Sequence, residues 1–230
     1  PAVRQVLLDA GLTITRLREE IAKLHLSDYR LDVETVVKNG IGGSQAHVII
    51  EQAHHSHRHR HLSHIREIID GSDLAESVKK RSTAIFTRLA EAEATIHDTD
   101  VEAVHFHEVG AMDAIIDIVG GVVGLSVLSV DKIFCSPLHV GSGTVECTHG
   151  TLPVPAPATA ELIKGKPVYS TGVAGELLTP TGAAILTTLS SGFGPMPAMC
   201  IEQIGYGAGR QDLKIPNLLR VCIGEAGIEA

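Results

Sequence analysis

Three residues able to bind a metal ion fall within four positions near the middle of the chain: His105, His107 and Glu108. A strongly apolar segment follows them, and its only charged residues are Asp113 and Asp117. Imidazole nitrogens and carboxylate oxygens are common ligands of transition metals. The spacing therefore predicts a metal site in this part of the chain.

The apolar spacing predicts that the segment from Asp113 onward is a buried helix. Asp113, Asp117, Gly121 and Gly124 would share one face, because residues three or four apart stack on a helix, while apolar residues cover the rest of it. Two carboxylates then point into the protein, where an ionised Asp needs a partner or a cation. The alternatives to a metal are that each Asp caps a loop or pairs with an arginine. The glycines allow a ligand or another backbone to approach closely.

A second group of imidazoles occupies residues 54–64, HHSHRHRHLSH. Neither an extended nor a helical form of this tract would build a hydrophobic core, so we predict a flexible, solvated insertion. Imidazole binds divalent nickel, zinc and copper, and a loose cluster suits metal capture better than a fixed geometry. The expected ligands in the tract are His54, His55, His57, His59, His61 and His64.

Two segments rich in glycine and threonine are candidates for holding an anion. Ser142, Gly143 and Thr144 could cradle one through backbone N–H groups, although the lysine and spacing of a P-loop are absent and an ordinary turn is the alternative. Residues 179–182, Thr-Pro-Thr-Gly, begin a predicted helix, whose N-terminus attracts anions. Capping by Thr179 or Thr181, next to Gly182, is the alternative there. His149 follows Cys147 by two positions, where an ordinary loop is the alternative to a ligand site.

The elements that must position these residues alternate between helices and short strands. Periodicity and turn residues predict helices over 2–10, 13–24, 65–70, 73–96, 157–164 and 183–189, besides the one from 113, and strands over 29–38, 46–53, 131–136, 167–170, 200–206 and 217–223. Thr13 and Asp73 are the expected N-caps, and Asn39-Gly40 is an expected hairpin turn. This alternation predicts an α/β domain, with a mixed α+β fold as the alternative, in one unit of residues 1–230.

Composition argues against several classes of partner. The net charge is −8, aromatic residues make up 3% and Trp is absent, which disfavours nucleic acid and anionic membrane surfaces. No apolar run reaches the roughly 20 residues of a membrane span, and no signal peptide opens the chain. Four widely spaced cysteines are typical of a reduced cytoplasmic protein.

The chain starts at Pro1 in helix-like sequence, so we expect a piece of a longer protein. The sequence leaves homo-oligomer formation open.

Three stretches together resemble one family. They are VHFHEVGAMDAIIDIVGG at 104–121, PLHVGSGTVECTHGTLPVPAPATAELI at 137–163 and GELLTPTGAAIL at 175–186. These are similar to the nickel-insertion proteins of lactate racemase maturation, the pyridinium-3,5-bisthiocarboxylic acid mononucleotide nickel chelatases, which also have an internal histidine-rich tract. The resemblance covers nearly the whole chain.

The resemblance implies a nickel chelatase of the lyase class that inserts Ni²⁺ into that mononucleotide, with CTP and Mg²⁺ or Mn²⁺, to make the nickel pincer cofactor. It also implies that this chain is the N-terminal part, and that the CTP-binding C-terminal domain lies outside it. The tract would gather nickel, and the expected fixed ligands are His105, His107, Glu108 and Asp117. Glu108, Asp113 or Asp117 would remove the ring proton, and the segments around Ser142–Thr144, His149 and Thr179–Gly182 would hold the mononucleotide.

Two other functions remain open from the sequence. One is a nickel storage or delivery module without chemistry of its own, which would lose most of its metal without residues 54–64. The other is an unrelated metal-dependent hydrolase, which would use the same His-x-His-Glu and Asp residues and would turn over without nickel.

Overall fold

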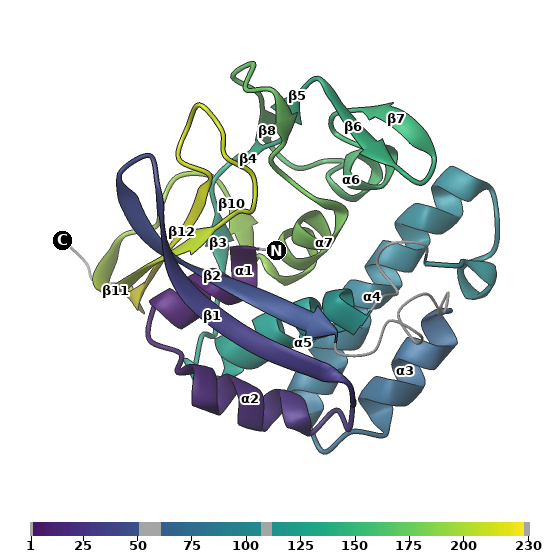
Figure 1. The fold of residues 1–230 in the computed structure, drawn as a ribbon, viewed down its shortest axis with the longest axis horizontal. Helices are drawn as coiled ribbons and strands as arrows, with labels where there is room; N and C mark the ends of the chain where they lie inside the picture. The colour runs from purple at the N-terminus through teal and green to yellow at the C-terminus, as the bar shows by residue number, and fades with distance from the viewer. Residues whose placement is uncertain (1, 51–60, 107–111, 228–230) are drawn as a thin grey trace.

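The computed structural model describes residues 2–50, 61–106 and 112–227 of the chain (Figure 1). It confirms the predicted α/β class. The helices are α1 (Ala2–Asp9), α2 (Ile14–Ala22), α3 (Leu62–Asp70), α4 (Glu76–His97), the short 3-10 helix η2 (Val101–Ala103), α5 (Met112–Val127), α6 (Pro157–Leu162) and α7 (Pro180–Leu189). The strands are β1 (Tyr29–Lys38), β2 (Ile41–Ile50), β3 (Phe134–Cys135), β4 (Leu138–His139), β5 (Gly141–Ser142), β6 (Thr144–Cys147), β7 (Gly150–Pro153), β8 (Val168–Tyr169), β9 (Gly175–Glu176), β10 (Gly192–Phe193), β11 (Met199–Ala208) and β12 (Leu218–Ala226).

The largest sheet has the strand order β1-β2-β11-β12. The predicted hairpin between β1 and β2 is confirmed, with Tyr29 opposite Ile50 and Lys38 opposite Ile41. Asn39 and Gly40 connect the strands at φ angles of 50° and 84°, the left-handed conformation that a tight two-residue hairpin needs. The second strand therefore begins at Ile41, five residues before the predicted start, because pairing resumes directly after the turn.

A second group of strands follows the backbone from Phe134 to Ser142. Along this run β3 pairs with β10, β4 with β8 and β5 with β9, while β6 and β7 form a separate hairpin. In Figure 1 the strands β4 to β8 lie at the top, above α7. This run carries the glycine-rich segment that the sequence predicted as an anion site, and the β5–β9 pairing places it close to the start of α7.

Helix α5 forms the centre of the hydrophobic core. Every residue from Ala114 to Leu125 is buried, which confirms the predicted buried helix. Helices α1, α2, α4 and α7 pack against it, so apolar neighbours surround most of its circumference (Figure 1). Each fully buried aliphatic side chain contributes about 1.5–3 kcal/mol to folding, and α5 is therefore a rigid support for the residues that flank it.

Three predicted helix starts are wrong, and the first is that of α7, which begins at Pro180 rather than Ala183. The N-cap of α4 is Ala75, with a φ of −60° and a ψ of 141°, rather than Asp73. Helix α3 begins at Leu62, three residues earlier than predicted, with His61 as its N-cap. Leu62, Ile65 and Ile69 are all fully buried, and this helical spacing of apolar residues extends α3 into the sequence that was predicted as a histidine-rich loop. Thr13, in contrast, is confirmed as the N-cap of α2.

No helix within the described ranges is both long and apolar enough to span a bilayer.

Candidate functional site

Histidines from two separate parts of the sequence meet at the N-terminus of α3. The ring centroids of His61 and His105 lie 4.1 Å apart, and those of His61 and His64 lie 5.6 Å apart. His61 and His64 come from the end of the histidine-rich tract, and His105 opens the His-x-His-Glu sequence. The fold therefore brings together two groups of predicted metal ligands that are separate in the sequence. We call His61, His64 and His105 the histidine junction.

Two imidazoles of the junction, those of His61 and His64, make different hydrogen bonds. The Nδ1 atom of His61 lies 3.2 Å from the carbonyl oxygen of Val104, and a carbonyl can only accept. In the tautomer with the proton on Nδ1, the ring donates to this carbonyl and Nε2 has a lone pair for a metal; in the other tautomer, the His61 side chain accepts from the backbone N–H of His64. Such an N–H to carbonyl bond is the usual way to orient a ligand histidine. The Nδ1 atom of His64 instead accepts from the backbone N–H of His61 at 3.4 Å.

The described residues do not form a complete metal site by themselves. Among residues 2–50, 61–106 and 112–227, no group of three or more His, Cys, Asp or Glu side chains is arranged to hold a metal ion. Several of the predicted ligands lie outside these ranges, namely His54, His55, His57, His59, His107 and Glu108. Their roles as ligands, and that of Glu108 as a base, stay predictions.

Asp117 forms a buried ion pair, one of the alternatives that the sequence left open. Its Oδ1 lies 2.7 Å from Nη1 of Arg4 on α1, and the two side chains are 9% and 2% exposed. Burial lowers the pKa of the Arg4 guanidinium, and the Asp117 carboxylate opposes that shift. Arg4 also donates to the carbonyl of Ala46 at 3.3 Å, so it connects α5, α1 and β2. The predicted roles of Asp117 as metal ligand and base remain untested.

Asp113 lies in the first turn of α5. Its Oδ1 accepts a hydrogen bond from the backbone N–H of Ala114 at 2.9 Å, and a carboxylate is stabilised at this end of a helix by the helix dipole. In the sequence, Asp113 lies close after the predicted ligands His107 and Glu108. Its catalytic role stays a prediction.

Two glycines of α5, the predicted Gly124 and its neighbour on the helix surface Gly120, accommodate α1. A Cβ atom added at Gly120 would lie 3.0 Å from Cδ of Arg4, and one at Gly124 would lie 2.8 Å from Cδ1 of Leu7. The close approach that the glycines allow is thus used by side chains of α1. Sequence reasoning missed Arg4, although an arginine among the apolar residues of a short helix is a signal for a buried ion pair.

The predicted anion segment at Ser142, Gly143 and Thr144 lies at the junction of β5 and β6. The Ser142 hydroxyl donates to the carbonyl of Val173 at 2.9 Å, and the carbonyl of Gly143 accepts from the N–H of Val154 at 2.9 Å. Gly143 has a φ of 86°, and apart from its chain neighbours no atom of the described residues lies within 4 Å of its Cβ position. The segment has the geometry of a turn, and its role in binding the mononucleotide remains a prediction.

Thr179 caps α7, as one of the two alternatives expected. Its hydroxyl accepts from the N–H of Gly182 at 3.2 Å, while Thr181 and Gly182 are buried in the first turn. We expect Thr179→Ala to lower the free energy of unfolding by about 1 kcal/mol, because that N–H loses its partner. Thr179→Ser keeps the acceptor and should lose little. Chemical denaturation of both variants measures this, and equal losses would contradict the capping role.

His149, predicted as a substrate ligand, meets a histidine that sequence reasoning missed. Its ring centroid lies 5.1 Å from that of His97 at the end of α4, and Nε2 of His97 lies 3.5 Å from Oε2 of Glu93. Glu93 and His97 are four residues apart, and residues at that spacing share a helix face. That spacing was therefore a signal in the sequence for a Glu93–His97 pair on one face of α4.

The four cysteines are free thiols, as expected, and burial raises the pKa of Cys135. A thiol whose pKa is raised stays protonated to higher pH, and the thiolate is the nucleophile. We therefore expect the alkylation of Cys135 by iodoacetamide to reach half its maximal rate above the pH of about 8.5 that is usual for cysteine. Mass spectrometry of the labelled peptide over a pH series, with glutathione as reference, measures this midpoint. A midpoint at or below that of glutathione would contradict the assignment.

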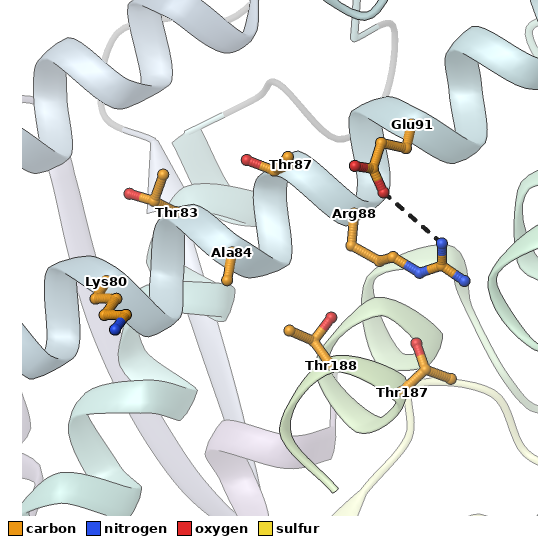
Figure 2. Close-up of a pocket in the computed structure, with 8 residues that line it drawn as sticks. All are labelled: Lys80, Thr83, Ala84, Thr87, Arg88, Glu91, Thr187 and Thr188. Atoms are coloured by element: carbon orange, nitrogen blue, oxygen red, sulfur yellow. Dashed lines mark ion pairs between the residues drawn. The ribbon is translucent and has the colours of Figure 1, made fainter.

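A shallow groove of about 460 Å³ between α4 and α7 contains none of the predicted site residues. Figure 2 shows Thr187 and Thr188 of α7 on the side of α4 that carries Ala84 and Arg88. Its exposed surface is mainly apolar, and its Arg88 and Glu91 side chains pair with each other at 3.7 Å. This groove is therefore not our candidate site.

The structure thus defines an α/β domain, and among its described residues imidazoles from separate elements meet at two places. The chain belongs to the nickel insertion protein family, whose family model matches residues 4–230. It is 54% identical over 223 residues to the pyridinium-3,5-bisthiocarboxylic acid mononucleotide nickel insertion protein of Desulfitobacterium hafniense, covering 97% of this chain and 55% of that protein. It is 48% identical over 227 residues to the protein of that name from Geobacillus kaustophilus, covering 95% of this chain and 55% of that protein.

A putative nickel insertion protein of Dictyoglomus thermophilum is 45% identical over 219 residues, covering 95% of this chain and 56% of that protein. The chain therefore spans about half the length of the curated relatives it matches. No solved structure gave a significant match.

Proposed function

We propose that this chain is the metal-handling and substrate-handling part of a longer protein that inserts nickel into pyridinium-3,5-bisthiocarboxylic acid mononucleotide. The names of the relatives from D. hafniense and G. kaustophilus describe this reaction. In the proposal, CTP and Mg²⁺ or Mn²⁺ act in the longer protein, with CTP bound by its C-terminal domain. Nickel is a substrate here rather than a resident cofactor.

The observation that carries the proposal is the histidine junction. The end of the tract lies directly against the start of the His-x-His-Glu sequence, since the rings of His61 and His105 are 4.1 Å apart. Nickel bound by the tract could therefore pass over a short distance to the ligands that begin at His105. Nε2 of His61 is the proposed ligand atom at the junction, with Nδ1 donating to the Val104 carbonyl at 3.2 Å.

The other steps of nickel insertion are holding the metal beside the substrate, removing a proton and binding the mononucleotide, and they are assigned to other residues of the chain. We propose that His105, His107 and Glu108 hold nickel beside the mononucleotide, and that Glu108 or Asp113 accepts the proton of the ring carbon that bonds to nickel. Asp117, paired with Arg4 at 2.7 Å, would keep α5 and Asp113 in place. The segments at Ser142–Thr144 and Thr179–Gly182, with His149, are the proposed contacts of the mononucleotide.

Measuring nickel binding by this chain distinguishes the proposed insertion function from that of a nickel storage module. We expect one tightly bound nickel ion that survives deletion of residues 54–59, because the fixed ligands remain. The double variant His61→Ala/His105→Ala should weaken that site by more than about tenfold. His25→Ala is the matched control, since its ring pairs with Asp73 beyond the other end of α3 at 3.0 Å. Isothermal titration with Ni²⁺ measures all of these constants. Loss of most bound nickel on deletion alone would favour storage.

A further inference from the structure

A groove of about 760 Å³ separates the region after α5 from the edge of the largest sheet. One wall consists of residues 128–136, which include β3, and the opposite wall consists of residues 220–226 of β12. Residues 194–197 and Met199 close the groove between these walls. None of the residues assigned to nickel or to the mononucleotide lines it.

Both walls are strand edges rather than sheet faces. Side chains of a strand alternate between its two faces, so a face would present every second residue. Here every residue of 132–136 and of 220–226 lines the groove, which places the backbone edge of each strand along it. Within the described residues, β12 is the last strand in the order β1-β2-β11-β12, and β3 is paired with β10 alone.

The hydrogen bonds of β3 show which of its edges is used. The carbonyl oxygens of Ile133 and Cys135 accept from the N–H groups of Ser191 and Gly194, at 2.7 and 2.9 Å. Backbone groups of successive strand residues point to opposite sides, so the N–H and C=O of Phe134 point away from β10 and toward the groove. An unpaired strand edge of this kind is a template for another strand.

Apolar side chains at the groove are left exposed beside these edges. Met196 is 57% exposed and Phe134 is 48% exposed. Proteins usually cover or charge their free strand edges, and exposed apolar residues next to two of them indicate that something covers this surface. The relatives contain further polypeptide that could cover this surface, because the matched region is only 55% of the length of the D. hafniense protein.

We propose that this groove is the docking site of one extended segment, which adds a β-strand between β3 and β12 and joins the two sheets. The segment belongs to the part of the longer relatives that lies outside the matched region. It would lie about 4.8 Å from each edge, take its main-chain hydrogen bonds from both and place apolar side chains against Phe134 and Met196. This is strand addition, and it would tie the matched region to the rest of the longer protein.

Hydrogen exchange tests the proposal on this chain and on the complete D. hafniense protein. We expect the amides of 132–136 and 220–226 to exchange rapidly in this chain. The aligned segments of the complete relative should exchange at least about tenfold more slowly after correction for intrinsic rates, because their amides are paired. Helix α4 is the internal reference. Equally fast exchange in both proteins would overturn the proposal. So would exchange in this chain that slows as its concentration rises, since a second copy would then occupy the groove.

Overlapping synthetic peptides from the unmatched part of the D. hafniense protein identify the segment. The peptide that docks should slow exchange in both walls of the groove in this chain. Met196→Lys should weaken its binding by about tenfold or more, because a charge replaces an apolar contact. Val37→Lys is the matched control, because Val37 is 68% exposed on β1 at the far edge of the sheet. Protection of one wall only, or equal affinity for both variants, would contradict the proposal.

Discussion

Replacing Asp117 by alanine is expected to destabilise this chain by about 3–5 kcal/mol, the usual cost of leaving one partner of a buried ion pair alone. Arg4 is 2% exposed, and its Nη1 lies 2.7 Å from the Asp117 carboxylate. Without that carboxylate, the guanidinium keeps its hydrogen bond to the Ala46 carbonyl at 3.3 Å and the more distant attraction of Asp113. The burial that already lowers the pKa of Arg4 would then act without the larger of its opposing charges, and Asp113 would oppose it alone.

The double variant Arg4→Met/Asp117→Leu provides the control for this prediction. It removes both charges and keeps apolar volume, so we expect it to recover most of the stability lost in Asp117→Ala. Urea denaturation of the three proteins measures the difference. A loss below about 1 kcal/mol in Asp117→Ala would mean that the pair is not buried as described, and would favour a metal-binding role for Asp117 instead.

Replacing Gly205 by alanine is expected to destabilise the chain by about 3 kcal/mol, at the upper end of overpacking effects. A Cβ atom at this position of β11 would overlap the carbonyl oxygen of Val6 and lie 2.7 Å from the backbone nitrogen of Ala10. Both obstacles are backbone atoms of α1 and the residues that follow it, so they cannot rotate away. The hydrogen bond from Tyr206 N–H to Asp9 at 2.8 Å holds this contact in place.

Gly42→Ala is the matched control for Gly205→Ala. Gly42 also lies in a strand of the largest sheet, and nothing stands within 4 Å of its Cβ position. We expect its effect to stay within about 0.5 kcal/mol. Thermal unfolding measures the stability of both variants. Similar stabilities would show that α1 does not press on β11 as the structure describes.

The parts of the fold that follow from local pattern were predictable. The buried helix α5 follows from apolar residues on nearly all sides of residues 113–125, and the β1–β2 turn follows from Asn39-Gly40. The α/β class follows from the alternation of such elements. The pairing of β2 with β11, through Ser44 and Gly207, was not predictable, because it joins residues more than 160 positions apart without a local signal.

The candidate site was predictable only in its residue types. The sequence supplied the tract, the His-x-His-Glu group and the two carboxylates, but contact between His61 and His105 depends on how α3 packs against the chain around Val104. The end of the tract was predicted as a loop because polar histidines dominate residues 54–64. The helical spacing of Leu62 and Ile65 lies at the very end of that run. His97 was missed because its neighbour His149 is far away in sequence.

Nickel insertion itself is the most direct test of the central claim, that the histidine junction delivers nickel to the mononucleotide. The test protein is a chimera in which this chain replaces the matched region of the D. hafniense protein. It is supplied with Ni²⁺, CTP, Mg²⁺ and pyridinium-3,5-bisthiocarboxylic acid mononucleotide, and mass spectrometry follows the nickel product. We expect the chimera and its His25→Ala variant to form product, and His61→Ala/His105→Ala to be slower by about 100-fold. Equal rates for the chimera and the double variant would contradict the account.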